Sequence, residues 1–526
     1  MGAQEFLSFC KDLLGQEFVS IPSSPQSCVS GFTRELTATV SPRSKEEVVQ
    51  IVKAANDFLV RLYPISRGRN WGFGSSLPTQ DDLILLDLSR LNRIHQVDLD
   101  HGYAIVEPGV TQKAMADHLT GLNAPYFLDV TGSSSDSSII GNALERGIAY
   151  HSLRVETISS LEIVLGSGEV IKTGFAQDHR FQSIGHLYKH GVGPSLDGLF
   201  FQSNFGIVVS ATIQLLPRPE EQCSFTIALE DEKNLLPLLN AIRPLLENQV
   251  LRCIPHVFNQ GRLYGGMAPL LADYFKAQGE SWSKESIHSY MSKHLPGKWF
   301  AVGVLSGTAE EIKSMKQALR KIAKSCGGAC TLLDERINRI IRVLLKLPFL
   351  KEKRALFHVS QVVRGLTIGV PTEKTLPSIW WPITPQKELQ SPDQLDSGKA
   401  GFIYNVPFVP FKSQDVERML KEVYSTLGSS GFEYAITLNL VTPQVVEAVI
   451  SIHYERDVKE QVDKVHNLVR RMTENLNDLG YPQYRTNIAM MDLVVDSKSD
   501  YWQVVKRLKS VFDPKGVIAP GRYCPE

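Results

Sequence analysis

The segment from Pro64 to Ser76 constrains the fold of this chain most strongly, because it joins three glycines, two arginines and several small hydroxyl side chains in one short loop. A helix is predicted before it, over 48–59, and a strand after it, over 83–88. Glycine lacks a Cβ and accepts positive φ, so its backbone can approach a ligand closely. Successive N–H groups in such a turn form an anion-binding concavity, and arginine adds bidentate donors. The loop therefore predicts phosphate binding, with an ordinary Gly/Ser surface loop as the alternative.

Two common phosphate-binding motifs are excluded by spacing. Nowhere in the chain does G-x-G-x-x-G open a helix after a strand, and no G-K-[ST] follows the loop. Other motifs along the chain must therefore identify the ligand of this loop.

Length and composition predict a multidomain globular protein without a nucleic-acid or membrane partner. The 526 residues exceed what one core supports. Lys plus Arg and Asp plus Glu both total 56, which leaves no net charge to attract nucleic acid or an anionic membrane. No stretch approaches 18 consecutive apolar residues, and the N-terminus lacks the basic region of a signal peptide. Seven scattered cysteines indicate neither a disulfide framework nor a metal site, so a reducing cytoplasm is expected.

The pattern of predicted elements divides the chain into four parts. Residues 1–34 are expected to form an N-terminal segment with a short helix over 6–14. Strands and helices are mixed over 35–217, and a proline-rich boundary separates them from a second region of mixed strands and helices over 218–475. Residues 476–526 end in a Gly/Pro-dense stretch that is expected to dock elsewhere. The predicted fold class is α+β throughout.

Several short motifs occur in a fixed order from residue 35 to the C-terminus. They are the loop 64–74 and the segments 106–110, 140–150, 191–194, 197–200, 202–208, 484–486 and 513–522. In this order they resemble the FAD-dependent vanillyl-alcohol oxidase / p-cresol methylhydroxylase family, with greatest similarity to its 4-phenol oxidase and eugenol oxidase branch. Each motif alone is weak, but the set is specific.

The resemblance implies a p-cresol-methylhydroxylase-type FAD-binding domain of two α+β subdomains over 35–217 and an α+β cap domain over the isoalloxazine at 218–475. The segment 476–526 would return to the FAD-binding domain and the active site. The residues implied to contact FAD are Ser66, Arg67, Gly68, Arg69, Asn70, Trp71, Pro108, Gly132, Ser133, Gly141, Asn142, Arg146, Gly147, Ile148, Gly206, Ile207, Val208, Arg485 and Arg522.

The same resemblance suggests catalytic roles. Arg485 matches an arginine that stabilises the negative charge arising near N1 and O2 of the reduced flavin. Tyr484 and Tyr150 match tyrosines of the phenol-binding pocket. Asp136 is a candidate base near N5, with a satisfied serine-rich turn as the alternative, and His151 is a second candidate base. His256 and His453 are interpreted as structural.

Departures from the family pattern suggest that the substrate has changed. Phe73 occupies the place of a phenol-binding tyrosine. Phe402 falls where a histidine tethers FAD in relatives, and Asn70 where another branch has its anchor histidine. We therefore expect noncovalent FAD, with Tyr404 as a less favoured covalent anchor.

The predicted function is that of a FAD-dependent oxidoreductase that takes a hydride from a small aromatic, para-substituted phenol-like substrate. O₂ is the expected electron acceptor, and an external acceptor and a homodimer stay open. The alternatives are oxidative decarboxylation, desaturation or cyclisation of a natural-product intermediate, a sugar-lactone or hydroxy-acid dehydrogenase, and a non-catalytic flavin-binding protein.

Overall fold

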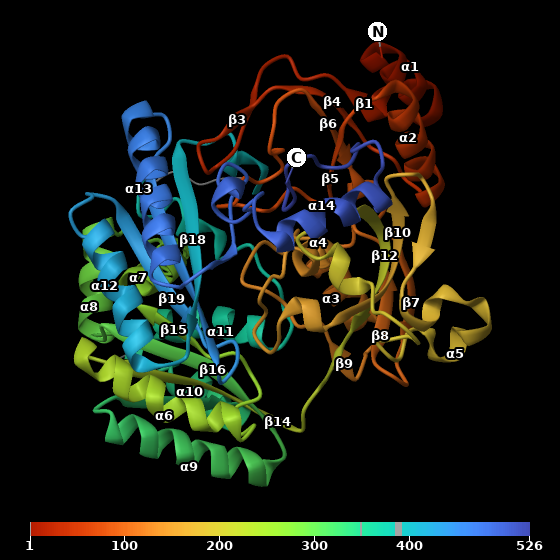
Figure 1. The fold of residues 1–526 in the computed structure, drawn as a ribbon. Helices are drawn as coiled ribbons and strands as arrows, with labels where there is room; N and C mark the ends of the chain where they lie inside the picture. The colour runs from red at the N-terminus through yellow and green to blue at the C-terminus, as the bar shows by residue number, and fades with distance from the viewer. Residues whose placement is uncertain (1, 348–349, 384–391, 526) are drawn as a thin grey trace.

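The computed structural model describes residues 2–347, 350–383 and 392–525 (Figure 1). Within them, an N-terminal sheet has the strand order β1-β4-β6-β5, with β4 and β5 parallel to β6. Its strands are β1 (Val19–Ser20), β4 (Leu36–Val40), β5 (Leu62–Ile65) and β6 (Leu83–Asp87). Helix α2 (Lys45–Phe58) covers it and packs on α1 (Gly2–Leu14). The helix and strand predicted around the glycine-rich loop are thus present, and the loop leaves the end of β5.

A second sheet has the strand order β11-β10-β12-β8-β7, and its pairs are antiparallel. Its strands are β7 (Ile94–Asp98), β8 (Tyr103–Val106), β10 (Ile158–Leu165), β11 (Val170–Lys172) and β12 (Gly206–Gln214). As predicted, β10 and β11 form a hairpin, and Thr111 caps α3 (Gln112–Gly121) by accepting the Ala114 N–H. The smaller elements nearby are β2 (Gln26–Ser27), β3 (Thr33–Arg34), β9 (Tyr126–Phe127), β13 (Leu216–Pro217), α4 (Ile139–Leu144) and α5 (Gln182–Gly185).

The third sheet has eight strands and the order β17-β14-β16-β15-β19-β20-β18-β21. The strands are β14 (Glu221–Leu229), β15 (His256–Asn259), β16 (Trp299–Gly307), β17 (Ala329–Asp334), β18 (Ala400–Pro410), β19 (Glu433–Asn439), β20 (Val445–Glu455) and β21 (Gln483–Arg485). One face packs on four helices to form the largest core (Figure 1). Those helices are α6 (Leu235–Glu247), α9 (Ala309–Ser325), α12 (Ser413–Leu427) and α13 (Lys459–Asp478).

Four further helices within residues 218–475 were not predicted from the sequence. They are α7 (Gln260–Ala277), α8 (Lys284–His294), α10 (Glu335–Leu344) and α11 (Lys351–Thr367). Helix α7 contains Gly265, Gly266 and Pro269, which lower helix propensity. Burial of its apolar side chains against α8 and α11 outweighs that cost.

The C-terminal segment adds to the N-terminal sheet after α14 (Asp500–Phe512). Leu62 donates its N–H to the Val517 carbonyl and accepts the Ala519 N–H, both at 2.7 Å. The buried Asp513 carboxylate accepts the N–H groups of Val517 and Ile518, which shapes the turn between α14 and this edge. Among the described helices, none is long and apolar enough to cross a bilayer.

Candidate active site

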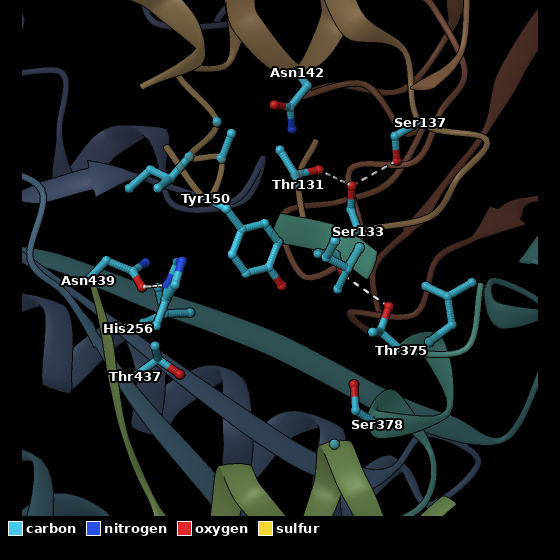
Figure 2. Close-up of a pocket in the computed structure, with 18 of the residues that line it drawn as sticks. Thr131, Ser133, Ser137, Asn142, Tyr150, His256, Thr375, Ser378, Thr437 and Asn439 are labelled. Carbon is cyan, nitrogen blue, oxygen red and sulfur yellow. Dashed lines mark hydrogen bonds between the residues drawn. The ribbon is translucent and has the colours of Figure 1, made fainter. Parts of the chain in front are cut away.

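A cavity of about 1300 Å³ lies between the two N-terminal sheets and the eight-stranded sheet. It exceeds the roughly 300–1000 Å³ of a typical ligand pocket, so it has room for more than one small molecule. Figure 2 shows Tyr150 between the Thr131–Ser133 loop and the strands that carry His256 and Asn439. The cavity is thus closed on one side by loops and on the other by a sheet.

The glycine-rich loop forms one end of the cavity. Gly68 and Gly72 have φ values of 66° and 82°, a region that side chains with a Cβ rarely adopt. Within the described chain, the N–H groups of Gly68, Asn70 and Trp71 donate to no protein acceptor. They are available to phosphate oxygens, as the sequence predicted for this loop.

Asp136 ties this loop to the serine-rich turn. Its Oδ1 lies 2.6 Å from Arg67 Nη2, and its Oδ2 lies 2.7 Å from Arg69 Nη2. Ser134 and Ser135 donate to the Glu373 carboxylate at 2.7 and 2.5 Å, and this fixes the turn. Among the described residues that line the cavity, Asp136 is absent. The geometry gives Asp136 an anchoring role, and its predicted role as a base gains no support.

Close backbone contacts at Gly141 and Gly147 shape the cavity wall next to the glycine-rich loop. A Cβ at Gly141 would lie 2.3 Å from Ser66 Oγ, and one at Gly147 would lie 2.2 Å from Asn142 Oδ1. Ser138 caps α4 by accepting the Gly141 N–H at 2.9 Å. All but one of the residues expected to contact the cofactor line the cavity, and the exception is Arg146.

Arg522 anchors the C-terminal tail at the cavity. Its Nη1 donates to the Tyr63 hydroxyl at 2.9 Å and its Nη2 to Glu145 Oε1 at 2.6 Å. Burial raises the pKa of Glu145, but the Arg522 and Arg485 charges more than offset this, so the pKa lies below its ordinary value. Glu145 is therefore a permanently ionised partner of Arg522.

Arg485 projects into the cavity from the edge strand β21. Its Nη2 donates to Asn70 Oδ1 at 2.7 Å, and its guanidinium lies 4.3 Å from the centroid of the Phe73 ring. Its Nε is buried and has no partner among the described residues. The loop thus holds a positive charge with donor capacity left for a ligand.

The other predicted catalytic residues separate into two groups. Tyr150 lines the cavity, packs edge-on against His256 at 5.1 Å, and has its pKa raised by burial to about 12. Tyr484 stacks on Phe408 with ring centroids 4.2 Å apart, and burial raises its pKa. His151 Nε2 lies 2.8 Å from the Thr367 carbonyl. Neither Tyr484 nor His151 is among the described residues of the cavity lining.

The candidate anchor Tyr404 also borders the cavity. Its ring packs 5.1 Å from Phe73 and 4.6 Å from Phe402, and it lies directly against the backbone of Gly72. His453, interpreted as structural, is buried with Nδ1 2.9 Å from the Ile379 carbonyl.

Two features of the cavity were missed in the sequence. The first is a row of polar side chains, His256, Asn439 and Glu447, on the neighbouring strands β15, β19 and β20. The second is Arg262 near the start of α7. The usable signal was the polar residues Asn439 and Glu447 within the largely apolar stretches 434–440 and 445–454.

Comparisons with known proteins agree with this geometry. Residues 36–174 match the FAD binding domain family model. The 1'-carboxy-chondrochloren decarboxylase of Chondromyces crocatus is 30% identical over 98% of this chain and 96% of its own length. The 4-cresol dehydrogenase [hydroxylating] flavoprotein subunit of Pseudomonas putida is 26% identical over 92% and 87%. The chain belongs to the vanillyl-alcohol oxidase / p-cresol methylhydroxylase family.

Solved structures of this family share the fold. The 4-ethylphenol oxidase from Gulosibacter chungangensis superposes with a TM-score of 0.83 at 23% identity, covering 99% of this chain and 97% of the other. Substrate-bound p-cresol methylhydroxylase gives 0.83 at 24% identity, covering 99% and 96%. The predicted family, α+β fold class, FAD cofactor and flavin oxidoreductase activity are therefore confirmed.

The family assignment gives the cavity its cofactor. Bound FAD supplies a two-electron acceptor. The free N–H groups of the glycine-rich loop would hold its pyrophosphate. Arg485 would supply a positive charge to stabilise the reduced flavin.

Proposed function

We propose that the protein oxidises a small aromatic, para-hydroxylated substrate, with O₂ as electron acceptor. The substrate would bind between the flavin and the eight-stranded sheet, which we call the cap sheet. The observation that carries this proposal is the placement of Arg485, which Asn70 and Phe73 hold in a cavity with aromatic walls. Tyr150 and Tyr404 supply rings against which a flat substrate can pack. The name of the 4-cresol dehydrogenase relative supports the same substrate class.

We also propose a structural role for each part of the chain. Residues 35–217 would form the FAD-binding domain and 218–475 the cap, with 476–526 returning to complete the site. The pairing of Leu62 with the 517–519 segment and the place of Arg485 on β21 support this arrangement.

A second candidate is oxidative decarboxylation of a carboxylated aromatic substrate, and Arg262 favours it. The guanidinium lines the cavity and has no acceptor in the described part of the chain. Burial lowers the pKa of His256 and His453, and the Arg262 charge lowers it further. Burial raises the pKa of Tyr150 and Tyr404, and the same charge offsets part of that rise. The Arg262 charge therefore lies near the four side chains just named, where the carboxylate of a bound substrate would pair with it. The decarboxylase relative has this activity in its name.

An anaerobic substrate panel tests these proposals. It pairs a 4-alkylphenol with a 4-hydroxyphenyl alkanoate of the same chain length, and adds a sugar lactone and a 2-hydroxy acid. Bleaching of the flavin by phenols supports the main proposal. Bleaching by lactone or hydroxy acid alone, or by dithionite alone, would overturn it in favour of a different oxidoreductase or a non-catalytic flavoprotein.

Arg262→Gln separates the two candidates. Loss of a charge-assisted hydrogen bond costs about 1.5–3 kcal/mol, so the carboxylated substrate should bind about 10- to 150-fold more weakly. The 4-alkylphenol should bind as before, and CO₂ release should accompany oxidation of the carboxylated substrate only. The exposed Arg252→Gln is the matched control. Equal losses on both substrates, or no CO₂, would remove the decarboxylation candidate.

A further inference from the structure

The polar row on the cap sheet is continuous. His256 stands opposite Asn439, and Asn439 stands opposite Glu447, in the registers of two adjacent strand pairs. His256 Nδ1 lies 2.5 Å from Asn439 Oδ1, and Asn439 Nδ2 donates to Glu447 Oε2 at 2.6 Å. All three side chains border the cavity, and Figure 2 shows the contact between His256 and Asn439.

The hydrogen bonds fix which atoms of this row donate and which accept. Because the Asn439 amide donates through Nδ2 to a carboxylate, its Oδ1 accepts, and the His256 proton must sit on Nδ1. Burial lowers the pKa of His256 to about 4, so the ring is neutral near pH 7. The row therefore ends in one chargeable group, Glu447.

Glu447 differs from the other acidic residue of the cavity. Among the described lining residues, Glu145 and Glu447 are the carboxylates. Glu145 is held by Arg522 at 2.6 Å. Glu447 is 4% exposed, and its Oε1 has no donor in the described chain. Burial raises the pKa of Glu447 to about 7, with Asn439 and then Arg485 acting in the opposite direction.

The charged and titratable groups that interact with Glu447 come from two strands, β21 with Arg485 and Tyr484 and β18 with Tyr404. Arg485 on β21 lowers the pKa of Glu447. Burial raises the pKa of Tyr484 and of Tyr404, and the charge of Glu447 raises both further. The free carboxylate oxygen thus lies in the same part of the site as the Arg485 charge.

Oxidation next to a para-hydroxylated ring needs a group that takes the phenolic proton, because the phenolate oxygen stabilises the carbon that loses hydride. Phe73 has no hydroxyl to assist, and Asp136 is held by two arginines. On the basis of the proposed function, we infer that Glu447 is the general base for the phenolic proton, and that Asn439 and His256 position it. In this step the O–H bond breaks, its proton goes to Glu447 Oε1, and the electron pair stays on the substrate oxygen.

Glu447→Gln in the FAD-loaded enzyme tests the inference. A general base supplies about 10²- to 10⁴-fold, so kcat/KM for a 4-alkylphenol should fall within that range. In the wild type, kcat/KM should rise with pH and level off above about 7, as the carboxylate ionises. The variant should lack this rise, and a more acidic ring-fluorinated phenol should restore part of its rate. The exposed Glu455→Gln on the same strand is the control.

A binding measurement separates catalysis from a structural role. At alkaline pH, Glu447→Gln should bind 4-nitrophenolate at least about tenfold more tightly than wild type, because the anion no longer meets an ionised carboxylate. A merely structural glutamate would give weaker binding on substitution. Asn439→Ala should move the rise in kcat/KM to higher pH, because it removes a hydrogen bond that lowers the pKa of Glu447.

The outcomes distinguish this inference from the proposed function. Wild-type enzyme that oxidises no phenol refutes the proposed function. Wild-type activity on phenols combined with an unchanged pH profile in Glu447→Gln overturns the role of Glu447 alone. If Glu447→Gln does not fold, an unshifted profile in Asn439→Ala overturns it instead.

Discussion

Gly72→Ala tests whether the shape of the glycine-rich loop holds FAD. The residue has φ +82°, and its backbone oxygen accepts the Tyr404 N–H at 3.2 Å. A Cβ there would lie 2.3 Å from Cδ2 of Tyr404, whose ring is confined by Phe73 and Phe402. The left-handed backbone costs an alanine about 1–2 kcal/mol, and overpacking adds about 1–3 kcal/mol.

These costs should appear in FAD affinity, because FAD requires the loop in its native shape. A total of roughly 2–5 kcal/mol corresponds to FAD binding weakened about 30- to 4000-fold. In a Tyr404→Ala background the ring contact is gone, so Gly72→Ala should cost only the backbone share, about 5- to 30-fold. The assay is titration of apoprotein with FAD, followed by the change in flavin fluorescence.

Gly198→Ala is the matched control, since a Cβ at Gly198 meets no atom within 4 Å. It should leave FAD affinity unchanged. An equal loss for Gly72→Ala in both backgrounds would refute the ring contact as the cause. No loss in either background would refute the assignment of this loop to FAD.

Two further predictions concern the flavin. Arg485→Ala should slow flavin reduction by about 10²-fold or more in anaerobic stopped flow, as loss of an electrostatic donor does. The partly exposed Arg470→Ala, which removes a pair with Asp492, should not. An unchanged rate in Arg485→Ala would remove Arg485 from the mechanism. Acid precipitation should release FAD into the supernatant, because neither the Phe402 nor the Asn70 side chain can form the covalent link expected of a histidine. Flavin that stays with the pellet, and leaves it in Tyr404→Phe, would establish Tyr404 as a covalent anchor.

The sequence located the glycine-rich loop and the cavity wall beside it, because both are built by local chemistry. Glycines at Gly68 and Gly72 take positive φ, and a cap at Ser138 fixes the wall beside Gly141. Such features depend on residues near one another in the chain, so motif order alone locates them.

The substrate half could not be predicted in the same way. His256, Asn439 and Glu447 are brought together by pairing of strands whose sequence separation reaches 183 residues. The register between β15 and β19 is not marked locally, because no short turn joins these strands and burial over the whole sheet sets it. Helix α7, which carries Arg262, escaped detection for its glycines and proline.

The replacements in this site are coupled through its electrostatics. Phe73 provides a ring face for the Arg485 guanidinium at 4.3 Å, where a tyrosine would have offered a hydroxyl to substrate. Asp136 neutralises two loop arginines rather than facing the cavity. With neither a Tyr hydroxyl at position 73 nor Asp136 at the cavity, Glu447 is a buried lining carboxylate on which the Arg485 charge acts. A buried acid with a raised pKa and a free oxygen is costly for the fold unless a substrate donor pairs with it. The same cost supports the role proposed for Glu447, in which the cap sheet and not the glycine-rich loop supplies the base.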